Sequence, residues 1–279
     1  MSPLDAVHGV ARELDQAGVP SPRVDAELLV ADVLGVSRPE LYASDRALGE
    51  AELARLRELV ARRRAREPLA YVLGEWGFRR LVLAVDARAL VPRPETEVAV
   101  ERCLVHLREL EAPRVVDVGT GSGAIALAIA DEHPGAHVVA VDRSEAALAL
   151  ARENLGRAGV DGRVELRQGD LLVGVEGPFD LVVSNPPYVP ASEFALLQPE
   201  IRLYEPYEAV VGDRVWERVA RDARAVLPPG GHLVLECGDG QAAELAEGLA
   251  ALGYDGVHCT PDLAGRDRVV EGHRRKSQA

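Results

Sequence analysis

The sequence predicts an α/β fold in which a doubly wound, mainly parallel sheet follows a small N-terminal bundle of helices. From about residue 114 onward, short hydrophobic runs typical of buried strands alternate with helical patterns. Before residue 67, apolar residues instead recur at helical spacing. A chain of 279 residues is long enough for a large and a small domain.

The composition is that of a globular protein with a surplus of acidic groups. Hydrophobic residues make up 47% and charged residues 28%, and the formal net charge is -13. Because nonspecific binding to a phosphate backbone needs clusters of Lys and Arg, this balance argues against it, although a local basic patch is still allowed. No apolar run approaches the roughly 20 residues of a membrane span, and the first residues lack a signal-peptide pattern. We expect a cytoplasmic protein, and a monomer.

The cysteine pattern speaks against a metal centre. Cys103, Cys237 and Cys259 lie far apart and show neither CxxC nor His/Cys spacing. We therefore expect no metal site and no disulfide framework, which suits a reducing compartment.

Three helical patterns precede residue 67. They cover residues 4–14, 24–33 and 50–66. Ser21 followed by proline is typical of a helix start, and Ser37 or Ser44 can cap further short helices. The second helix is expected to bury a face formed by Val24, Leu28, Leu29, Ala31 and Val33.

Four arginines, Arg62, Arg63, Arg64 and Arg66, close the third of these helices. Cations at this position suit the helix macrodipole. A contact with an acidic partner or with RNA is the alternative explanation.

A β-hairpin is expected to link the two parts of the chain. Leu81, Leu83 and Val85 alternate with other residues as in a strand. Trp76 and Phe78 either pack inside this linker or form a wall of a substrate crevice. The resulting domains are a helical domain over residues 1–70, a hairpin linker over 71–92 and a cofactor-binding domain over 93–279.

The run Val91-Pro-Arg-Pro-Glu-Thr-Glu leads into the first helix of the cofactor-binding domain, which is expected to end near Leu110. Its prolines stiffen the entry, and Glu95 and Glu97 suit a helix N-terminus. A helix cap alone explains the run as well as a functional role does.

A strand, a glycine-rich turn and a helix follow one another over residues 114–129. Glycines permit the tight turn and let a ligand approach the backbone, although close helix packing is the alternative. The spacing also satisfies the dinucleotide fingerprint, so the turn alone does not separate NAD from S-adenosylmethionine. The candidate cofactor-binding residues here are Gly119, Thr120, Gly121, Ser122 and Gly123.

Two acidic residues end the next two strands. Asp142 lies about 20 residues beyond the turn, where a ribose hydroxyl pair is held in such folds; a helix cap is the alternative. Asp170, after the third strand, is a candidate acceptor for an adenine amino group. Leu171 is the candidate to cover the adenine ring.

Asn185-Pro186-Pro187-Tyr188 follows the fourth strand, over residues 179–184, and is the most specific motif. Two prolines remove two N–H donors and fix φ at both positions. What remains is a rigid set of acceptors, the Asn185 side-chain oxygen and the Pro186 carbonyl. Such a pair can bind both hydrogens of a planar –NH₂ group, and Tyr188 supplies a flat ring beside it. A plain strand-ending turn is the alternative.

These motifs resemble class I S-adenosylmethionine-dependent methyltransferases that act on nitrogen, a Rossmann-like fold. Further runs resemble the HemK/PrmC family, the glutamine methyltransferases of peptide chain release factors. The resemblance covers nearly the whole chain. The runs that carry it are 66–71, Gly74-Glu75 with Phe78, 91–97, Glu205-Pro206 and 264–269.

The resemblance implies methylation of the side-chain amide nitrogen of the Gln in the Gly-Gly-Gln motif of release factors. S-adenosyl-L-methionine is the implied methyl donor and S-adenosyl-L-homocysteine the product. Asn185 and Pro186 match the catalytic positions, and 185–188 match the substrate contacts. Leu171 departs from relatives with an aromatic residue there and loses stacking. The implied cofactor contacts are Gly119 to Gly123, Asp142, Asp170, Leu171 and Asn185.

Other classes share parts of this pattern. Ribosomal-protein glutamine methyltransferases and DNA adenine methyltransferases also use Asn-Pro-Pro-Tyr. A DNA enzyme needs a base-flipping, sequence-reading surface, and the chain has neither a large recognition domain nor a basic surplus. An NAD-dependent oxidoreductase would not need the acceptor-only motif. A non-catalytic binding protein would not need the turn, the acid and the tetrapeptide together.

Overall fold

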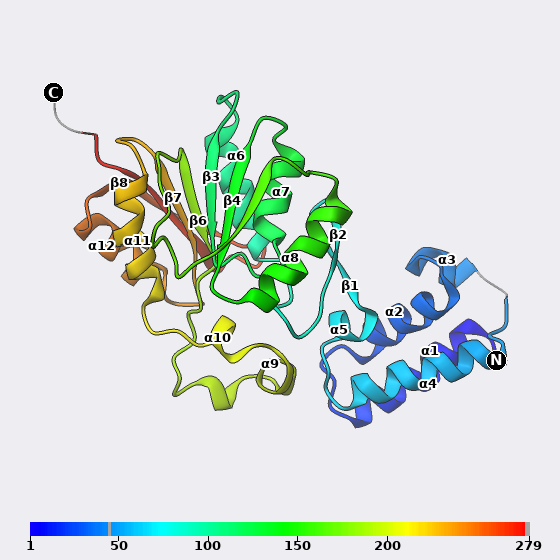
Figure 1. Cartoon of the computed structure of the whole chain (residues 1–279). Helices are drawn as coiled ribbons and strands as arrows, with labels where there is room; N and C mark the ends of the chain where they lie inside the picture. Colours follow the sequence, from blue (N-terminus) through cyan, green and yellow to red (C-terminus); the bar gives the residue numbers. More distant parts are fainter. Residues whose placement is uncertain (44–45, 277–279) are drawn as a thin grey trace. The chain divides into compact units, whose positions relative to one another are not determined.

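The computed structural model describes residues 1–43 and 46–276. The chain divides into two compact units (Figure 1). The helical unit comprises Met1–Glu75 and Leu197–Tyr204, and the sheet unit comprises Trp76–Leu196 and Glu205–Ala279. The helix cap expected at Ser44 lies outside the described residues.

The helical unit is a bundle whose core contains several buried leucines. Its helices are α1 (Pro3–Gln16), α2 (Pro22–Leu34), α3 (Arg38–Ala43), α4 (Glu50–Arg64), α5 (Leu69–Leu73) and α9 (Pro199–Tyr204). The leucines with no exposed surface include Leu14, Leu29, Leu41 and Leu59. The predicted amphipathic patterns therefore form helices, and their apolar faces meet in one core.

The expected helix starts are only partly right. Ser37 caps α3, because its hydroxyl accepts from the Glu40 backbone N–H while the Glu40 carboxylate accepts from the Ser37 N–H. Ser21 occupies the N-cap position of α2 and Pro22 is its first residue, as predicted, but the Ser21 side chain makes no capping hydrogen bond. The helix expected over 50–66 ends at Arg64, since Arg66 has a φ of +68°, outside the helical region.

The arginine cluster is largely paired inside the helical unit. Arg63 is buried; its Nε donates to Asp25 at 2.7 Å and its Nη1 to Glu200 at 2.9 Å. Arg66 binds both carboxylate oxygens of Glu200 at 2.7 Å. Burial raises the pKa of Asp25 in spite of the Arg63 cation. The acidic groups that pair with Arg63 and Arg66 therefore belong to the chain itself, namely Asp25 and Glu200.

The expected burial of Val24 is wrong. Val24 is 42% exposed, whereas the next residue, Asp25, is buried. The ion pair with Arg63 makes burial of that carboxylate possible, because a buried charge needs a partner.

The sheet unit contains a seven-stranded sheet in the order β5-β4-β3-β6-β7-β9-β8. The first five strands of this order, β5, β4, β3, β6 and β7, run parallel to one another. Strand β9 pairs antiparallel with both β7 and β8. The doubly wound, mainly parallel sheet is confirmed. Its strands are β3 (Arg114–Val118), β4 (His137–Asp142), β5 (Val164–Gln168), β6 (Leu181–Ser184), β7 (His232–Glu236), β8 (Tyr254–Pro261) and β9 (Asp267–Arg274).

Helices cover both faces of this sheet, as Figure 1 shows. Val115 packs with α6 and α7, while its neighbour Val116 packs with α11 and α12, as expected for a strand buried on both faces. The α6 helix ends at Leu107, one turn before the predicted Leu110. The remaining helices are α6 (Thr96–Leu107), α7 (Ala124–Glu132), α8 (Glu145–Ala158), the 3₁₀ turn η1 (Phe194–Leu196), α10 (Tyr207–Val210), α11 (Val215–Val226) and α12 (Ala242–Ala251).

The expected hairpin is formed by β1 (Glu75–Phe78) and β2 (Leu81–Ala84). Phe78 and Leu83 are buried in the core on the α6 and α7 side of the large sheet. Of the two explanations considered for Phe78, the structure therefore supports packing.

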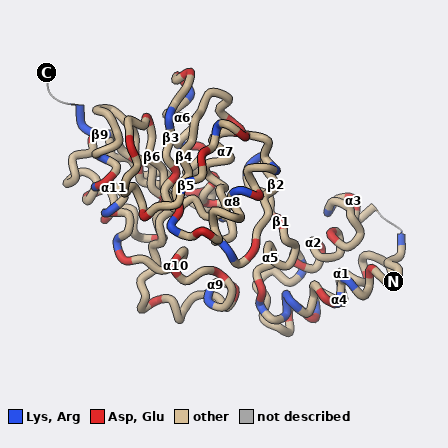
Figure 2. The backbone as a smooth tube through the Cα atoms, viewed as in Figure 1, with Lys and Arg blue, Asp and Glu red and all other residues tan. Residues whose placement is uncertain are grey.

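Basic and acidic residues are mixed along the backbone of both units (Figure 2). Within residues 1–43 and 46–276, no helix is both long and apolar enough to cross a membrane. In the same residues, no group of three or more His, Cys, Asp and Glu is arranged to hold a metal ion.

Candidate functional site

A cavity of about 590 Å³ lies in the sheet unit, beyond the carboxyl ends of β3, β4, β5 and β6. This is where open α/β sheets bind ligands, and the volume is in the range of roughly 300–1,000 Å³ typical of small-molecule sites. The predicted site residues that line it are Gly119, Thr120, Gly121, Ser122, Asp142, Asp170, Leu171, Asn185 and Pro187. Gly123, Pro186 and Tyr188 are not among its lining residues.

Asp142 closes the glycine-rich turn. Its Oδ2 accepts from the Gly121 N–H at 2.8 Å, and its Oδ1 accepts from the Ser144 N–H at 2.8 Å. It therefore also makes the helix-start contact that was the alternative explanation. Each carboxylate oxygen has two lone pairs, so both can still accept from a ligand.

The three glycines of the turn serve different needs. Gly119 and Gly121 have φ values of +75° and +57° and line the cavity. Gly123 has a φ of +86°, and a Cβ there would lie 3.1 Å from Leu127 and 3.3 Å from Ala151. Its contacts are therefore those of helix packing, the alternative considered for these glycines.

Asp117, on β3, holds the glycine-rich turn by hydrogen bonds and was not among the site residues predicted from the sequence. It has no exposed surface, and its Oδ2 accepts from the Thr120 hydroxyl at 2.6 Å and from the Ala126 N–H at 3.2 Å. Burial raises the pKa of Asp117 to about 7 in spite of these hydrogen bonds. Its Oδ1 has no partner within the described part of the chain.

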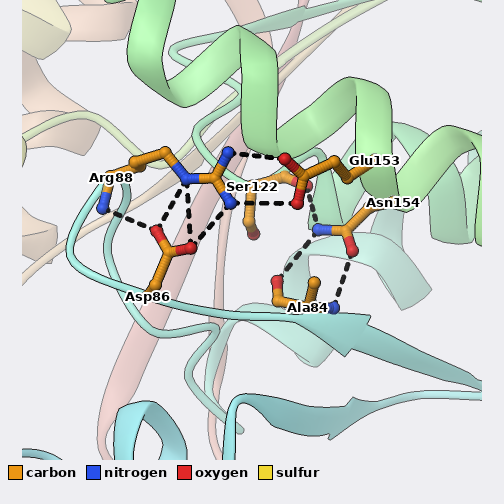
Figure 3. A network of polar contacts seen from close by, with 6 residues as sticks. All are labelled: Ala84, Asp86, Arg88, Ser122, Glu153 and Asn154. Carbon is orange, nitrogen blue, oxygen red and sulfur yellow. Dashed lines mark hydrogen bonds and ion pairs between the residues drawn. The ribbon is translucent and has the colours of Figure 1, made fainter.

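Asn154, on α8, connects the turn to the hairpin (Figure 3). Its Nδ2 donates to the Ser122 carbonyl at 2.9 Å and to the Ala84 carbonyl at 3.1 Å, and its Oδ1 accepts from the Ala84 N–H at 2.7 Å. Nearby, Arg88 binds Asp86 and Glu153. Residues 88–93, which follow, form one wall of the cavity.

We expect Asn154→Leu to lower the free energy of unfolding by about 2–4 kcal/mol, because it leaves buried backbone groups unpaired. Urea unfolding measures this change. The control is Glu153→Gln on the same helix, which weakens an exposed ion pair and should cost about 1 kcal/mol or less. Equal losses for the two variants would contradict the assigned role of Asn154.

Asp170 and Leu171 also line the cavity. Asp170 forms an exposed ion pair with Arg218 at 3.0 Å. Leu171 has a φ of +52°, a conformation that leucine seldom adopts, and it contacts the core on the α11 and α12 side. Such backbone strain is concentrated at ligand sites.

The Asn-Pro-Pro-Tyr run is held at the end of β6. The Ser184 hydroxyl donates to the Val118 carbonyl at 2.7 Å, which fixes the strand end against β3. Asn185 lines the cavity, and its Nδ2 donates to Thr96 Oγ1 at 3.2 Å. Pro186, the next residue, is buried.

Two glycines that the sequence did not single out make room for this run. A Cβ on Gly212 would lie 2.5 Å from the Pro187 carbonyl oxygen. A Cβ on Gly238 would lie 3.0 Å from the Tyr188 ring, and Gln241 donates to the Tyr188 carbonyl at 2.9 Å. Burial raises the pKa of Tyr188 to about 12, so its hydroxyl stays protonated at neutral pH.

We expect Gly212→Ala to lower turnover about tenfold or more. The new methyl group must displace the Pro187 backbone, and with it the acceptor array formed by the Asn185 side-chain oxygen and the Pro186 carbonyl. The matched control is Gly156→Ala on α8, where a Cβ meets nothing within 4 Å. Steady-state kinetics compare the two variants. Normal turnover in Gly212→Ala would show that the position of Pro187 does not matter.

Arg93 and Glu205, from two of the runs that carry the family resemblance, meet at the cavity. Arg93 lines it and donates from Nη2 to Glu205 Oε2 at 2.6 Å. Glu205 is buried, which raises its pKa in spite of the Arg93 cation. The pair fixes the chain just before Pro206 and Glu208, which also line the cavity.

Comparison with known proteins matches the two parts of the chain separately. Residues 5–74 match the PrmC N-terminal domain, and residues 96–198 match the methyltransferase small domain. A release factor glutamine methyltransferase of Deinococcus radiodurans is 44% identical over 277 residues, which cover 97% of this chain and 98% of that protein. A release factor glutamine methyltransferase of Streptomyces coelicolor is 43% identical over 281 residues, with coverage of 97% and 98%.

Solved structures share the fold at low sequence identity. A methyltransferase from Pyrococcus furiosus has a TM-score of 0.52 and 20% identity, covering 81% of this chain and all (100%) of that chain. A 16S rRNA methyltransferase of T. thermophilus, in complex with AdoMet and guanosine, has a TM-score of 0.52 and 19% identity, with coverage of 72% and 50%. Methyltransferases therefore share the sheet and helix arrangement described above.

Proposed function

The chain belongs to the family of release factor glutamine methyltransferases, and from this premise we propose that it methylates the Gln of the Gly-Gly-Gln motif in peptide chain release factors. The methyl group goes from S-adenosyl-L-methionine to the side-chain amide nitrogen, which releases one of its two hydrogens as a proton to the solvent. The observation that carries the proposal is Asn185, followed by two prolines, on the wall of a nucleoside-sized cavity.

The cavity residues fit S-adenosylmethionine. Gly119 and Gly121 let a ligand approach the backbone, and Asp142 has lone pairs for two ribose hydroxyls. We propose that Asp170 accepts from an adenine amino group and that Leu171 gives an apolar cover; both residues line the cavity. When bound, the cofactor supplies an electrophilic methyl group and leaves as S-adenosyl-L-homocysteine.

Asn185 and Pro186 act on the substrate amide. Its nitrogen is a weak nucleophile because its lone pair is delocalised into the carbonyl. Two acceptors, the Asn185 side-chain oxygen and the Pro186 carbonyl, bind both amide hydrogens and stabilise positive charge that develops on the nitrogen. Holding the reactants in line can lower the barrier by about 7–11 kcal/mol in favourable cases. Pro187 and Tyr188 complete the substrate contacts.

The proposed domains are a helical domain over residues 1–70, a hairpin linker over 71–92 and the methyltransferase domain over 93–279. The two matched regions, 5–74 and 96–198, support this division. We further propose that the enzyme acts as a monomer in the cytoplasm, where release factors work.

Incubation with labelled S-adenosylmethionine tests the function. Purified release factor, ribosomal protein and DNA are offered in parallel, and the label is mapped to a residue. We expect label on the Gln of Gly-Gly-Gln and no label on a release factor in which that Gln is replaced by Glu. Label on a ribosomal protein or on adenine, with none on the release factor, would overturn the proposal.

A further inference from the structure

A row of polar side chains runs from Asn185 through Thr96 to Glu236 in the interior of the sheet unit. Asn185 Nδ2 donates to Thr96 Oγ1 at 3.2 Å. The Thr96 side chain faces the Glu236 carboxylate and lowers its pKa, against the effect of burial. Thr96 is the first residue of α6, and Glu236 is the last residue of β7. Thr96 and Glu236 are only 4% and 2% exposed, so the protein itself must provide their hydrogen-bond partners.

The direction of the hydrogen bond between Asn185 and Thr96 follows from the donor inventory. A carboxylate only accepts, and a threonine hydroxyl has one hydrogen. When that hydrogen points to Glu236, the Thr96 oxygen offers a lone pair to Asn185. The Asn185 amide then keeps its nitrogen toward Thr96 and its oxygen on the other side.

The orientation of this amide decides whether the site can work. With the oxygen toward the cavity, Asn185 accepts from the substrate N–H. In the reversed orientation the Asn185 –NH₂ group would face the substrate N–H, and because both are donors they could not form a hydrogen bond. Nothing in an asparagine side chain alone distinguishes the two orientations, because its nitrogen and oxygen occupy nearly the same volume.

We propose that Thr96 and Glu236 are positioning residues that keep the Asn185 amide oxygen turned toward the substrate. The proposal rests on the proposed function. The alternative is that Thr96 only begins α6, but its hydroxyl oxygen accepts from Asn185, and Glu95, the N-cap residue of α6, makes no side-chain capping hydrogen bond. A structural role for Glu236 is poorly supported, since its Oε2 is buried without a partner in the described residues.

Glu236 also makes the orientation sensitive to pH. Burial raises the pKa of Glu236 to about 7; the other charged and titratable groups that face it are Glu95, Arg93, Arg268, Tyr188 and Cys237. Below this pKa the carboxyl carries a proton that it can donate to Thr96. The Thr96 hydroxyl can then donate to Asn185 and favour the reversed amide. Turnover should therefore fall as the pH drops through about 7.

The test compares Thr96→Val with Thr96→Ser. Valine keeps the shape and removes the hydroxyl, so kcat should fall about tenfold, the value of one hydrogen bond, while the Kd of S-adenosylmethionine measured by calorimetry stays the same. Serine keeps the hydroxyl and should retain most of the turnover. The matched control is Thr260→Val on β8, whose buried hydroxyl oxygen has no partner within the described chain.

A double-mutant cycle separates positioning from a general structural effect. In Asn185→Asp a carboxylate presents an acceptor whichever way it turns, so adding Thr96→Val should cause no further loss of kcat. Glu236→Gln should also lose the fall in turnover near pH 7, a readout that remains if Thr96→Val does not fold. Additive losses in the cycle, or an unchanged pH profile in Glu236→Gln, would overturn the proposal.

The outcome also distinguishes this inference from the proposed function. A wild-type enzyme that methylates release factors, together with a Thr96→Val variant of normal kcat, overturns the positioning role alone. A wild-type enzyme that leaves release factors unmodified overturns both.

Discussion

Asn185→Ala is expected to lower the rate of methyl transfer by about 10²–10³, the loss typical of one preorganised polar group at a reacting centre. The cavity wall formed by the glycine turn and Asp142 stays in place, so the Kd of S-adenosylmethionine should change far less. Single-turnover methylation of a release factor measures the first quantity, and calorimetry measures the second.

The control for this variant is Ser192→Ala, an exposed position on the same loop. Its turnover should match the wild type. Near-normal methylation by Asn185→Ala would show that the acceptor array is not the substrate site.

Asp142→Ala should instead weaken cofactor binding by about 10- to 150-fold. Hydrogen bonds to a charged group contribute about 1.5–3 kcal/mol, and the carboxylate also holds the Gly121 N–H in the turn. Calorimetry with S-adenosylmethionine measures the Kd, and turnover at saturating cofactor should be less affected.

Because Asp142 also contacts the start of α8, the thermal unfolding of the cofactor-free variant must be compared with the wild type. Asp161→Ala, at an exposed acidic position beyond that helix, is the control for lost charge. A wild-type Kd in Asp142→Ala would remove this residue from the cofactor site.

The features that the sequence predicted well are local in the chain. Each of these features depends on residues that are neighbours in the sequence and whose types dictate their conformation. They are the strand before Gly119, the end of β4 at Asp142 and the Asn-Pro-Pro-Tyr run. Parallel strands then bring their carboxyl ends to one edge of the sheet, so these motifs meet without further information.

The contacts that could not be predicted join distant residues. Asn154 lies 70 residues from Ala84, and Thr96 lies 89 residues from Asn185. Neither pair leaves a periodic signal, because one polar side chain is enough to form each link. The role of Gly212 could not be predicted for the same reason. A side chain is excluded at this position only because the folded chain brings the Pro187 backbone close to it.

Hydrophobic patterning failed at α2 for a related reason. It treats charged positions as exposed, yet Asp25 is buried and Val24 is not. Only the position of Arg63, 38 residues further along the chain, makes that burial favourable.

The position of β9 between β7 and β8 has a consequence for synthesis on the ribosome. Until residue 274 has been translated, β7 exposes an open row of backbone donors and acceptors to other nascent chains. Glu236, at the end of that strand, pairs in register with Val269 of β9, so its backbone lacks this neighbour until β9 has been made. We expect a chain released in this interval to be prone to intermolecular strand pairing at this edge.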